Sequence, residues 1–180
     1  MKPLDILVCI NDRKDLFSKV KRWAMGRYEH VEMYLGVLDV PGTEKDIPML
    51  YETDNRGVVI QTVKHKQRRH VRVMRFTVRS KQRTEELIQT AVDIASESSS
   101  YYDWKGLVKF AALRVLREKF GVYRPLLKYK RDRRMICSEA VAEVFWRNGM
   151  LILPKNIIPV PADFANPTDK LAYIEETHLK

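Results

Sequence analysis

The middle of the chain is a series of short apolar segments, and their period of two residues limits the fold class. Residues 31–40 alternate, with Val31, Met33, Leu35 and Val37 on one face of a predicted strand and His30, Glu32, Tyr34 and Gly36 on the other. Further strands are predicted at Met49–Glu52, Val58–Val63 and Val71–Val78, with a tight connection at Asn55–Gly57. Successive short strands with short links indicate a mainly antiparallel sheet.

Helical patterns flank this region on both sides. A strand at Leu4–Cys9 precedes a helix at Asp15–Met25, and a second helix is predicted at Glu85–Ser96 with Thr84 as its N-cap. Later elements are helices over residues 103–120 and 138–147, a turn at Ala162–Asn166 and a last strand at Leu171–Glu175. We therefore expect an α+β fold in one domain, 1–180, with five or six strands.

The charge of the chain is strongly positive, at +10 for 180 residues. The excess lies in three runs, Lys64–Arg72, Arg79–Arg83 and Lys128–Arg134. These runs can face an anionic polymer, an anionic lipid surface or nucleic acid, or be a solvated surface. We favour the solvated surface over nucleic acid because no aromatic residues interleave the runs as in a stacking platform.

Two absences set the expected compartment. No stretch approaches the roughly 20 apolar residues of a membrane span, and the N-terminus lacks a signal h-region. The two cysteines are too few for a disulfide framework. We expect a soluble, cytoplasmic protein with reduced thiols and no transmembrane segment.

Cys137 is the better candidate for a nucleophile. It starts the inward stripe of a predicted helix, where the helix dipole and the unpaired amides of the first turn favour a thiolate. Cys9 lies inside an apolar strand, where a cysteine usually behaves as a small buried hydrophobe.

A cysteine nucleophile needs a base, and His30 is the histidine placed on a predicted strand. His65 and His70 lie in a basic run, and His178 lies in the tail. The histidines and cysteines show no metal-ligand spacing, so we expect no metal and no cofactor.

Several motifs around these residues occur in the order of one family. Leu4–Gly36, with its EHVEMYLG segment, is followed by YETDNRGVVI, YYDW, ICSEAVAEVF and PADFANP. Together they resemble the circularly permuted NlpC/P60 proteins, the YiiX-like group of papain-like thiol hydrolases. The chain departs from the pattern at Glu29, where a small residue is usual, and at Glu32, where glycine is usual.

The resemblance implies a papain-like antiparallel sheet packed against helices, with the nucleophile Cys137 at a helix N-terminus and His30 as its base. It implies that Glu52 orients the imidazole, with Glu32 and Asp54 as substitutes. Glu32 shares a face with His30 and can narrow the cleft. Tyr102 or Tyr101 would line the substrate or oxyanion site, together with the amide at Ser138.

The implied activity is acyl transfer from an amide or ester to water or another acceptor. We expect an amidase or peptidase on a cell-wall-type peptide, delivered by a phage or acting after lysis if it acts outside the cell. A lipid or other acyl-ester hydrolase or acyltransferase is the alternative. A further alternative is a non-catalytic module that binds nucleic acid or anionic lipid through the basic runs. The oligomeric state stays open.

Overall fold

The computed structural model describes residues 1–12, 19, 22, 26–38, 46–54, 56–66, 69–77, 80–97, 135–155 and 159–179. The helix expected at Asp15–Met25 falls almost entirely outside these residues. The helix expected over 103–120 and the basic run Lys128–Arg134 also lie outside them.

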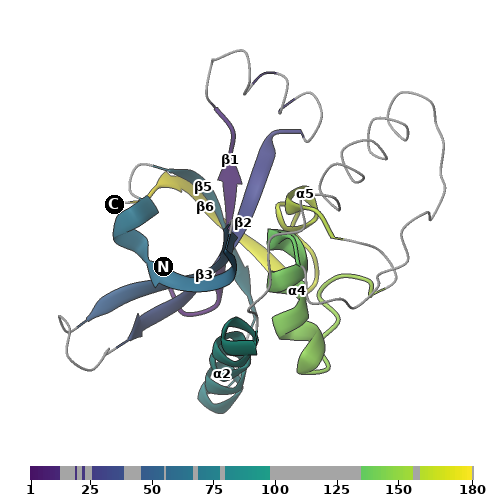
Figure 1. The fold of residues 1–180 in the computed structure, drawn as a ribbon. Helices are drawn as coiled ribbons and strands as arrows, with labels where there is room; N and C mark the ends of the chain where they lie inside the picture. The colour runs from purple at the N-terminus through teal and green to yellow at the C-terminus, as the bar shows by residue number, and fades with distance from the viewer. Residues whose placement is uncertain are drawn as a thin grey trace.

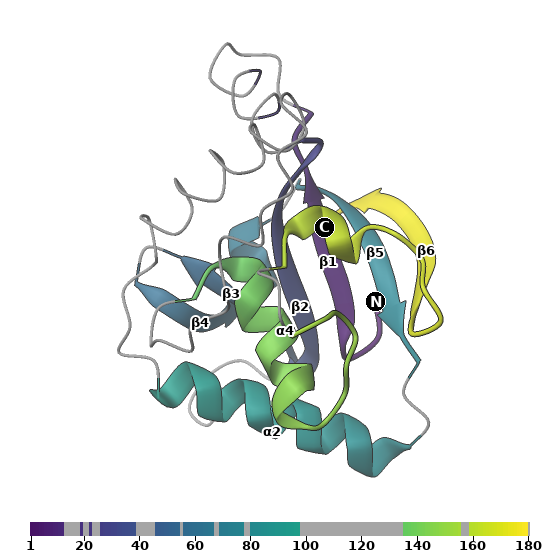
Figure 2. The same ribbon diagram turned by 90° about the vertical axis from the view of Figure 1, so that its right-hand side faces the viewer.

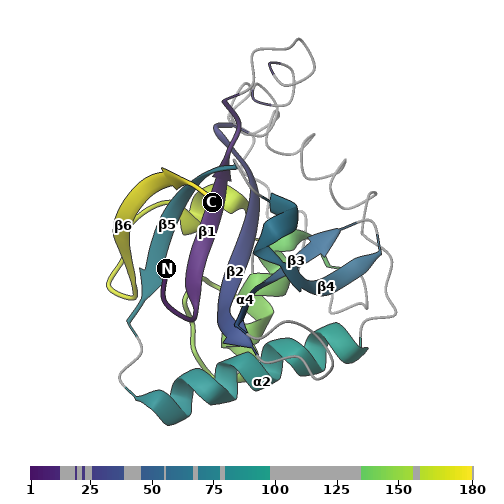
Figure 3. The same ribbon diagram turned by 90° about the vertical axis from the view of Figure 1, so that its left-hand side faces the viewer.

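Six described strands form one antiparallel sheet in the order β4-β3-β2-β1-β5-β6 (Figure 3). Their bounds are β1 Asp5–Ile10, β2 Tyr28–Leu38, β3 Ile47–Asp54, β4 Gly57–Thr62, β5 His70–Phe76 and β6 Leu171–His178, with a short 3-10 helix, η1, at Val63–Lys66. The α+β class and the antiparallel sheet expected from the sequence are confirmed.

The helix α2, Lys81–Glu97, begins four residues before the predicted start. Ser80 rather than Thr84 caps it, because the Ser80 Oγ accepts a hydrogen bond of 3.2 Å from the Arg83 backbone N–H. The Thr84 hydroxyl instead donates to the Ser80 carbonyl. The first turn is wholly polar, so the apolar stripe on which the prediction rested starts only at Leu87.

The C-terminal elements also differ from the expected ones. The predicted turn at Ala162–Asn166 is a short helix, α5, at Pro161–Phe164. Pro161 stands at its first position, where a proline costs no helical hydrogen bond. The last strand continues to His178 instead of ending at Glu175, paired along β5. Its exposed residues lack the clean alternation from which a strand is recognised.

The two helices nearest the C-terminus cover one face of the sheet (Figures 1 and 2). The helix α4, Cys137–Arg147, packs on β2 and β3, and α5 packs on β1 and β2. Tyr51, wholly buried on β3, donates a hydrogen bond of 3.1 Å to the Ala140 carbonyl of α4. The core between α4 and the sheet includes Val31 and Val141. This packing fixes the start of α4 beside β2 and β3.

Among the described helices, none is long and apolar enough to cross a membrane.

Candidate active site

The start of α4 is a polar feature inside a buried region. Cys137 is the first residue of the helix, and the Ile136 backbone N–H before it donates to the Glu139 carboxylate at 2.9 Å. Ser138 is wholly buried, and its hydroxyl donates to the Pro159 carbonyl at 2.6 Å. These bonds hold the first turn of α4 in place. The backbone amides of this turn have no acceptor within the helix, and they point toward Cys137.

His30 lies on β2 with its imidazole between α4 and β3. Its Nε2 atom is 2.8 Å from Oε2 of Glu52, a residue of β3 that is 1% exposed. The Asp54 carboxylate is instead held by Arg56, whose Nε donates to it at 2.9 Å. Of the three carboxylates considered from the sequence, Glu52 makes the short contact with His30.

The charges of His30 and Cys137 depend on each other. Burial lowers the pKa of His30, but the Cys137 thiolate and the hydrogen bond with Glu52 outweigh it and raise that pKa from 6.5 to about 10. Burial raises the pKa of Cys137, but the charge and hydrogen bond of His30 lower it below its ordinary value. The backbone N–H groups of Val31 and Ser138 add to this lowering by donating to the sulfur. The site therefore favours a thiolate–imidazolium pair.

Glu32 forms a second polar contact of the imidazole. Its Oε1 atom is 3.6 Å from His30 Nε2, and its side chain is wholly buried. The same oxygen accepts a hydrogen bond from the Arg69 guanidinium and one of 3.5 Å from the Cys9 thiol. Arg69 compensates the charge of Glu32, so this carboxylate can stay buried beside His30. Glu52 therefore remains the main partner of the His30 imidazole.

Cys9 and Arg69 take part in the same network. Burial and the neighbouring Glu32 charge raise the pKa of Cys9, so this thiol stays protonated. Burial lowers the pKa of Arg69, but Cys9, Glu32 and Glu52 raise it above its ordinary value. A thiol in this setting is a poor nucleophile, which agrees with the choice of Cys137.

The sequence analysis brought together Cys137, His30, Glu52, Glu32 and Ser138, and all five lie within this part of the fold. Tyr101 and Tyr102 lie outside the described residues. Arg69 was missed because it stood in a basic run that we interpreted as surface. No local sequence signal marks it, because only the pairing of β5 with β1, beside β2, brings Arg69 to Glu32.

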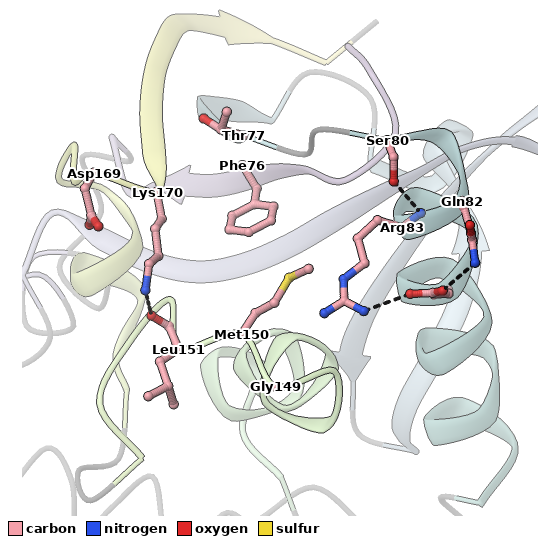
Figure 4. Close-up of a pocket in the computed structure, with 11 residues that line it drawn as sticks. Phe76, Thr77, Ser80, Gln82, Arg83, Gly149, Met150, Leu151, Asp169 and Lys170 are labelled. Carbon is pink, nitrogen blue, oxygen red and sulfur yellow. Dashed lines mark hydrogen bonds and ion pairs between the residues drawn. The ribbon is translucent and has the colours of Figure 1, made fainter.

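A well-defined groove among the described residues lies elsewhere. A groove of about 810 Å³ lies beside Gly149 and Met150, beyond the C-terminal end of α4 (Figure 4). The helix separates it from Cys137 by roughly 16 Å. Its two cations are already engaged, Arg83 with Glu86 at 2.8 Å and Lys170 with the Leu151 carbonyl at 2.7 Å. The groove is therefore separate from the candidate active site.

Two groups of described side chains place three metal-ligating atoms within 4.8 Å of one another. One is His30, Glu32 and Glu52 in the candidate active site; the other is Asp12, His70 and His178 at the edge of the sheet. The first group combines two residues of β2 with one of β3, and the second combines β5, β6 and the segment after β1. Because these segments are separated in the sequence, no ligand spacing indicates either group.

No protein-family model matches the chain, and no curated protein matches its sequence. Among solved structures, the chain is similar to the metalloprotein YiiX from Escherichia coli O157:H7. The TM-score is 0.58, the sequence identity is 17%, and the match covers 98% of each chain. This likeness confirms the YiiX-like fold that the sequence motifs predicted, and at this identity it shows the fold alone.

Proposed function

We propose that the chain is a cysteine-dependent acyl hydrolase or transferase with Cys137 as nucleophile, His30 as general acid and base, and Glu52 as the group that orients the imidazole. The observation that supports it is the continuous contact from the Cys137 sulfur through His30 to Glu52. Nucleophile, base and orienting carboxylate in this order are the elements of covalent acyl transfer. The motifs that resemble permuted NlpC/P60 hydrolases point to the same residues.

The first half of the reaction uses the thiolate. The Cys137 sulfur attacks the carbonyl carbon of an amide or ester, a C–S bond forms, and the carbonyl π electrons move to the oxygen. We assign amides in the first turn of α4 as the donors to this oxygen. As the tetrahedral intermediate collapses, the C–N or C–O bond breaks and the His30 imidazolium gives its proton to the leaving group. An acyl thioester and a neutral imidazole remain.

The second half returns the site to its starting state. Neutral His30 takes a proton from water or another acceptor, whose oxygen or nitrogen attacks the thioester carbonyl. The C–S bond breaks, the thiolate leaves, and the imidazolium is restored. Glu52 keeps the ring in place during both proton transfers because its bond to Nε2 leaves the other ring nitrogen for the thiol.

We propose a peptide amide of cell-wall type as substrate, with a lipid or other acyl ester as the alternative. A positively charged protein suits an acidic wall polymer. In the run Lys64–Arg72, Arg69 and Arg72 favour the enzyme over a binding module, because they are engaged with Glu32 and Tyr28 within the fold.

YiiX is described as a metalloprotein, so the donor set in the candidate active site needs a test against a metal ion. His30, Glu32 and Glu52 offer one nitrogen and two carboxylates. However, the Arg69 guanidinium already donates to Glu32 Oε1, which places a fixed positive charge beside the position of the ion. The positive charges that these carboxylates require come from Arg69 and His30. The arrangement does not fit a metal, and no step of the reaction uses one.

The test uses acyl-enzyme trapping. The protein is incubated with peptide p-nitroanilides and with p-nitrophenyl esters of short and long acyl chains, and intact mass spectrometry follows the adduct. An acyl adduct on Cys137 that Cys137→Ala and His30→Ala both abolish supports the proposal. Cys9→Ser is the matched control and retains the adduct, because the Cys9 thiol is buried and protonated. Adducts that persist in Cys137→Ala refute the assignment.

A further inference from the structure

A second cluster of chemically active side chains lies at the β5–β6 end of the sheet. His70, the first residue of β5, pairs directly with His178, the last residue of β6. Their rings are stacked, with centroids 4.7 Å apart and planes inclined by 13°. Asp12, two residues after β1, places its Oδ2 atom 3.2 Å from His70 Nδ1. Three segments far apart in the sequence therefore meet here.

The separation of the first two donors suits one ion. Zinc bonds to histidine nitrogen and carboxylate oxygen at about 2.0–2.2 Å, and a tetrahedral angle between such bonds sets the two ligand atoms about 3.4 Å apart. The 3.2 Å between His70 Nδ1 and Asp12 Oδ2 is close to that value. The His178 ligand atom lies within 4.8 Å of both. Because His178 is exposed, its ring can turn toward the ion without displacing core side chains.

Among the described residues, the charges around the cluster are balanced. Arg27 and Arg72 are both engaged with Glu176, Arg27 at 2.9 Å and Arg72 at 3.9 Å. Glu176 is also 4.0 Å from His70 Nε2. Its carboxylate thus compensates the two guanidinium groups on the side of His70 that faces away from Asp12.

We propose that Asp12, His70 and His178 form a surface binding site for a divalent transition-metal ion of the zinc type, with water completing the coordination. Imidazole and carboxylate donors suit such an ion. The ion would tie the end of the edge strand β6 to β5 and to the segment after β1. This site is independent of the proposed acyl-transfer reaction, since none of its residues contributes to that reaction.

The test measures Zn²⁺ binding directly. Protein without a histidine tag is stripped with EDTA, desalted and titrated with ZnCl₂ by calorimetry at about pH 7.5. We expect one equivalent to bind and the melting temperature to rise by about 5–10 °C at a hundredfold excess over Kd. His70→Gln and His178→Gln should each weaken binding at least tenfold, and Asp12→Asn should also weaken it.

Matched controls separate this site from other donors. Asp169→Asn removes an exposed carboxylate outside the cluster, and Cys137→Ser and Glu52→Gln alter the candidate active site; all three should leave binding unchanged. Binding that survives His70→Gln and His178→Gln, or that disappears in Glu52→Gln, would overturn the proposal, as would no binding to the wild type.

A spectroscopic measurement keeps the test decisive if a variant fails to fold. Co²⁺ added to the wild type should broaden the imidazole NMR signals of His70 and His178 before those of His30. Broadening that begins at His30 would overturn the proposal.

Discussion

Replacing Glu52 with glutamine tests the electrostatics of the candidate site while keeping the shape of the side chain. Glu52 is 1% exposed and accepts a 2.8 Å bond from His30, so the substitution replaces a carboxylate by a neutral amide in a buried contact. A hydrogen bond to a charged group contributes about 1.5–3 kcal/mol. One pKa unit corresponds to about 1.4 kcal/mol. The pKa of His30 should therefore fall from about 10 by about one to two units.

This change moves the proton equilibrium between His30 and Cys137. The thiolate–imidazolium form becomes less favourable relative to the neutral pair by the same one to two units, about 10- to 100-fold. The rate of Cys137 alkylation by iodoacetamide near neutral pH should fall, by at most that factor, because the thiolate fraction drops only as far as the neutral pair becomes populated. Site-resolved mass spectrometry between about pH 5 and pH 10 measures it. In the wild type, the rate should vary little over the range in which an ordinary thiol gains about tenfold per pH unit.

Asp54→Asn is the matched control, because it removes a carboxylate from the end of the same strand that is held by Arg56. It should react like the wild type. Circular dichroism checks that both variants are folded. Unchanged alkylation in Glu52→Gln together with slow alkylation in Asp54→Asn would refute the assignment of the orienting group.

Four further predictions concern the same region. Cys137→Ala removes the main cause that raises the pKa of His30, so that pKa should fall well below about 10, because burial lowers it and only Glu52 and Glu32 still raise it; an NMR titration of the imidazole measures this. In the wild type, the contribution of protonated His30 to the free energy of unfolding is full below its unfolded pKa of about 6.5 and is lost as pH rises through about 10. Tyr51→Phe should lower the free energy of unfolding in urea by about 1 kcal/mol, because it removes a buried hydrogen bond between β3 and α4; no loss would show that this bond does not fix α4. EDTA should leave the alkylation rate of Cys137 unchanged, and a slower rate would show that a metal acts at the site.

The sequence predicted well those elements whose side chains follow a single period. The strand around Val31 and the helix after Cys137 have such a pattern, and the structure contains both. Element ends were predicted less well, because caps such as Ser80 act through one hydrogen bond rather than through periodicity. His178 was placed in the tail, since nothing local indicates that its segment pairs with β5.

The residues of the candidate site also differ in how well the sequence predicts them. His30 and Cys137 could be chosen from their places on a strand and at a helix start, and Glu52 from its motif. Arg69 could not be chosen, because its role depends on which strands are neighbours in the sheet. Arg69 stands in a run of cationic residues in the sequence. It differs from the others only in that it contacts a buried carboxylate, Glu32, which the sequence does not reveal.

Glu32 stands where the resembling family has glycine, and Arg69 explains how the fold accommodates it. A buried carboxylate 3.6 Å from His30 Nε2 would disturb the pairing of His30 with Glu52 unless its charge were compensated. Arg69→Met should therefore lower the free energy of unfolding by about 2–3 kcal/mol, below the full value for a buried pair because Arg69 is partly exposed.

A variant with both Glu32 and Arg69 replaced tests whether Arg69 compensates the charge of Glu32 or whether the two residues act independently. Glu32→Gln alone leaves the Arg69 cation near His30, so the pKa of His30 should fall and Cys137 alkylation should slow. Glu32→Gln combined with Arg69→Met removes both charges and should recover most of the stability and of the alkylation rate. If the losses of stability and of alkylation rate in the two single variants add up in the double variant, Arg69 and Glu32 act separately.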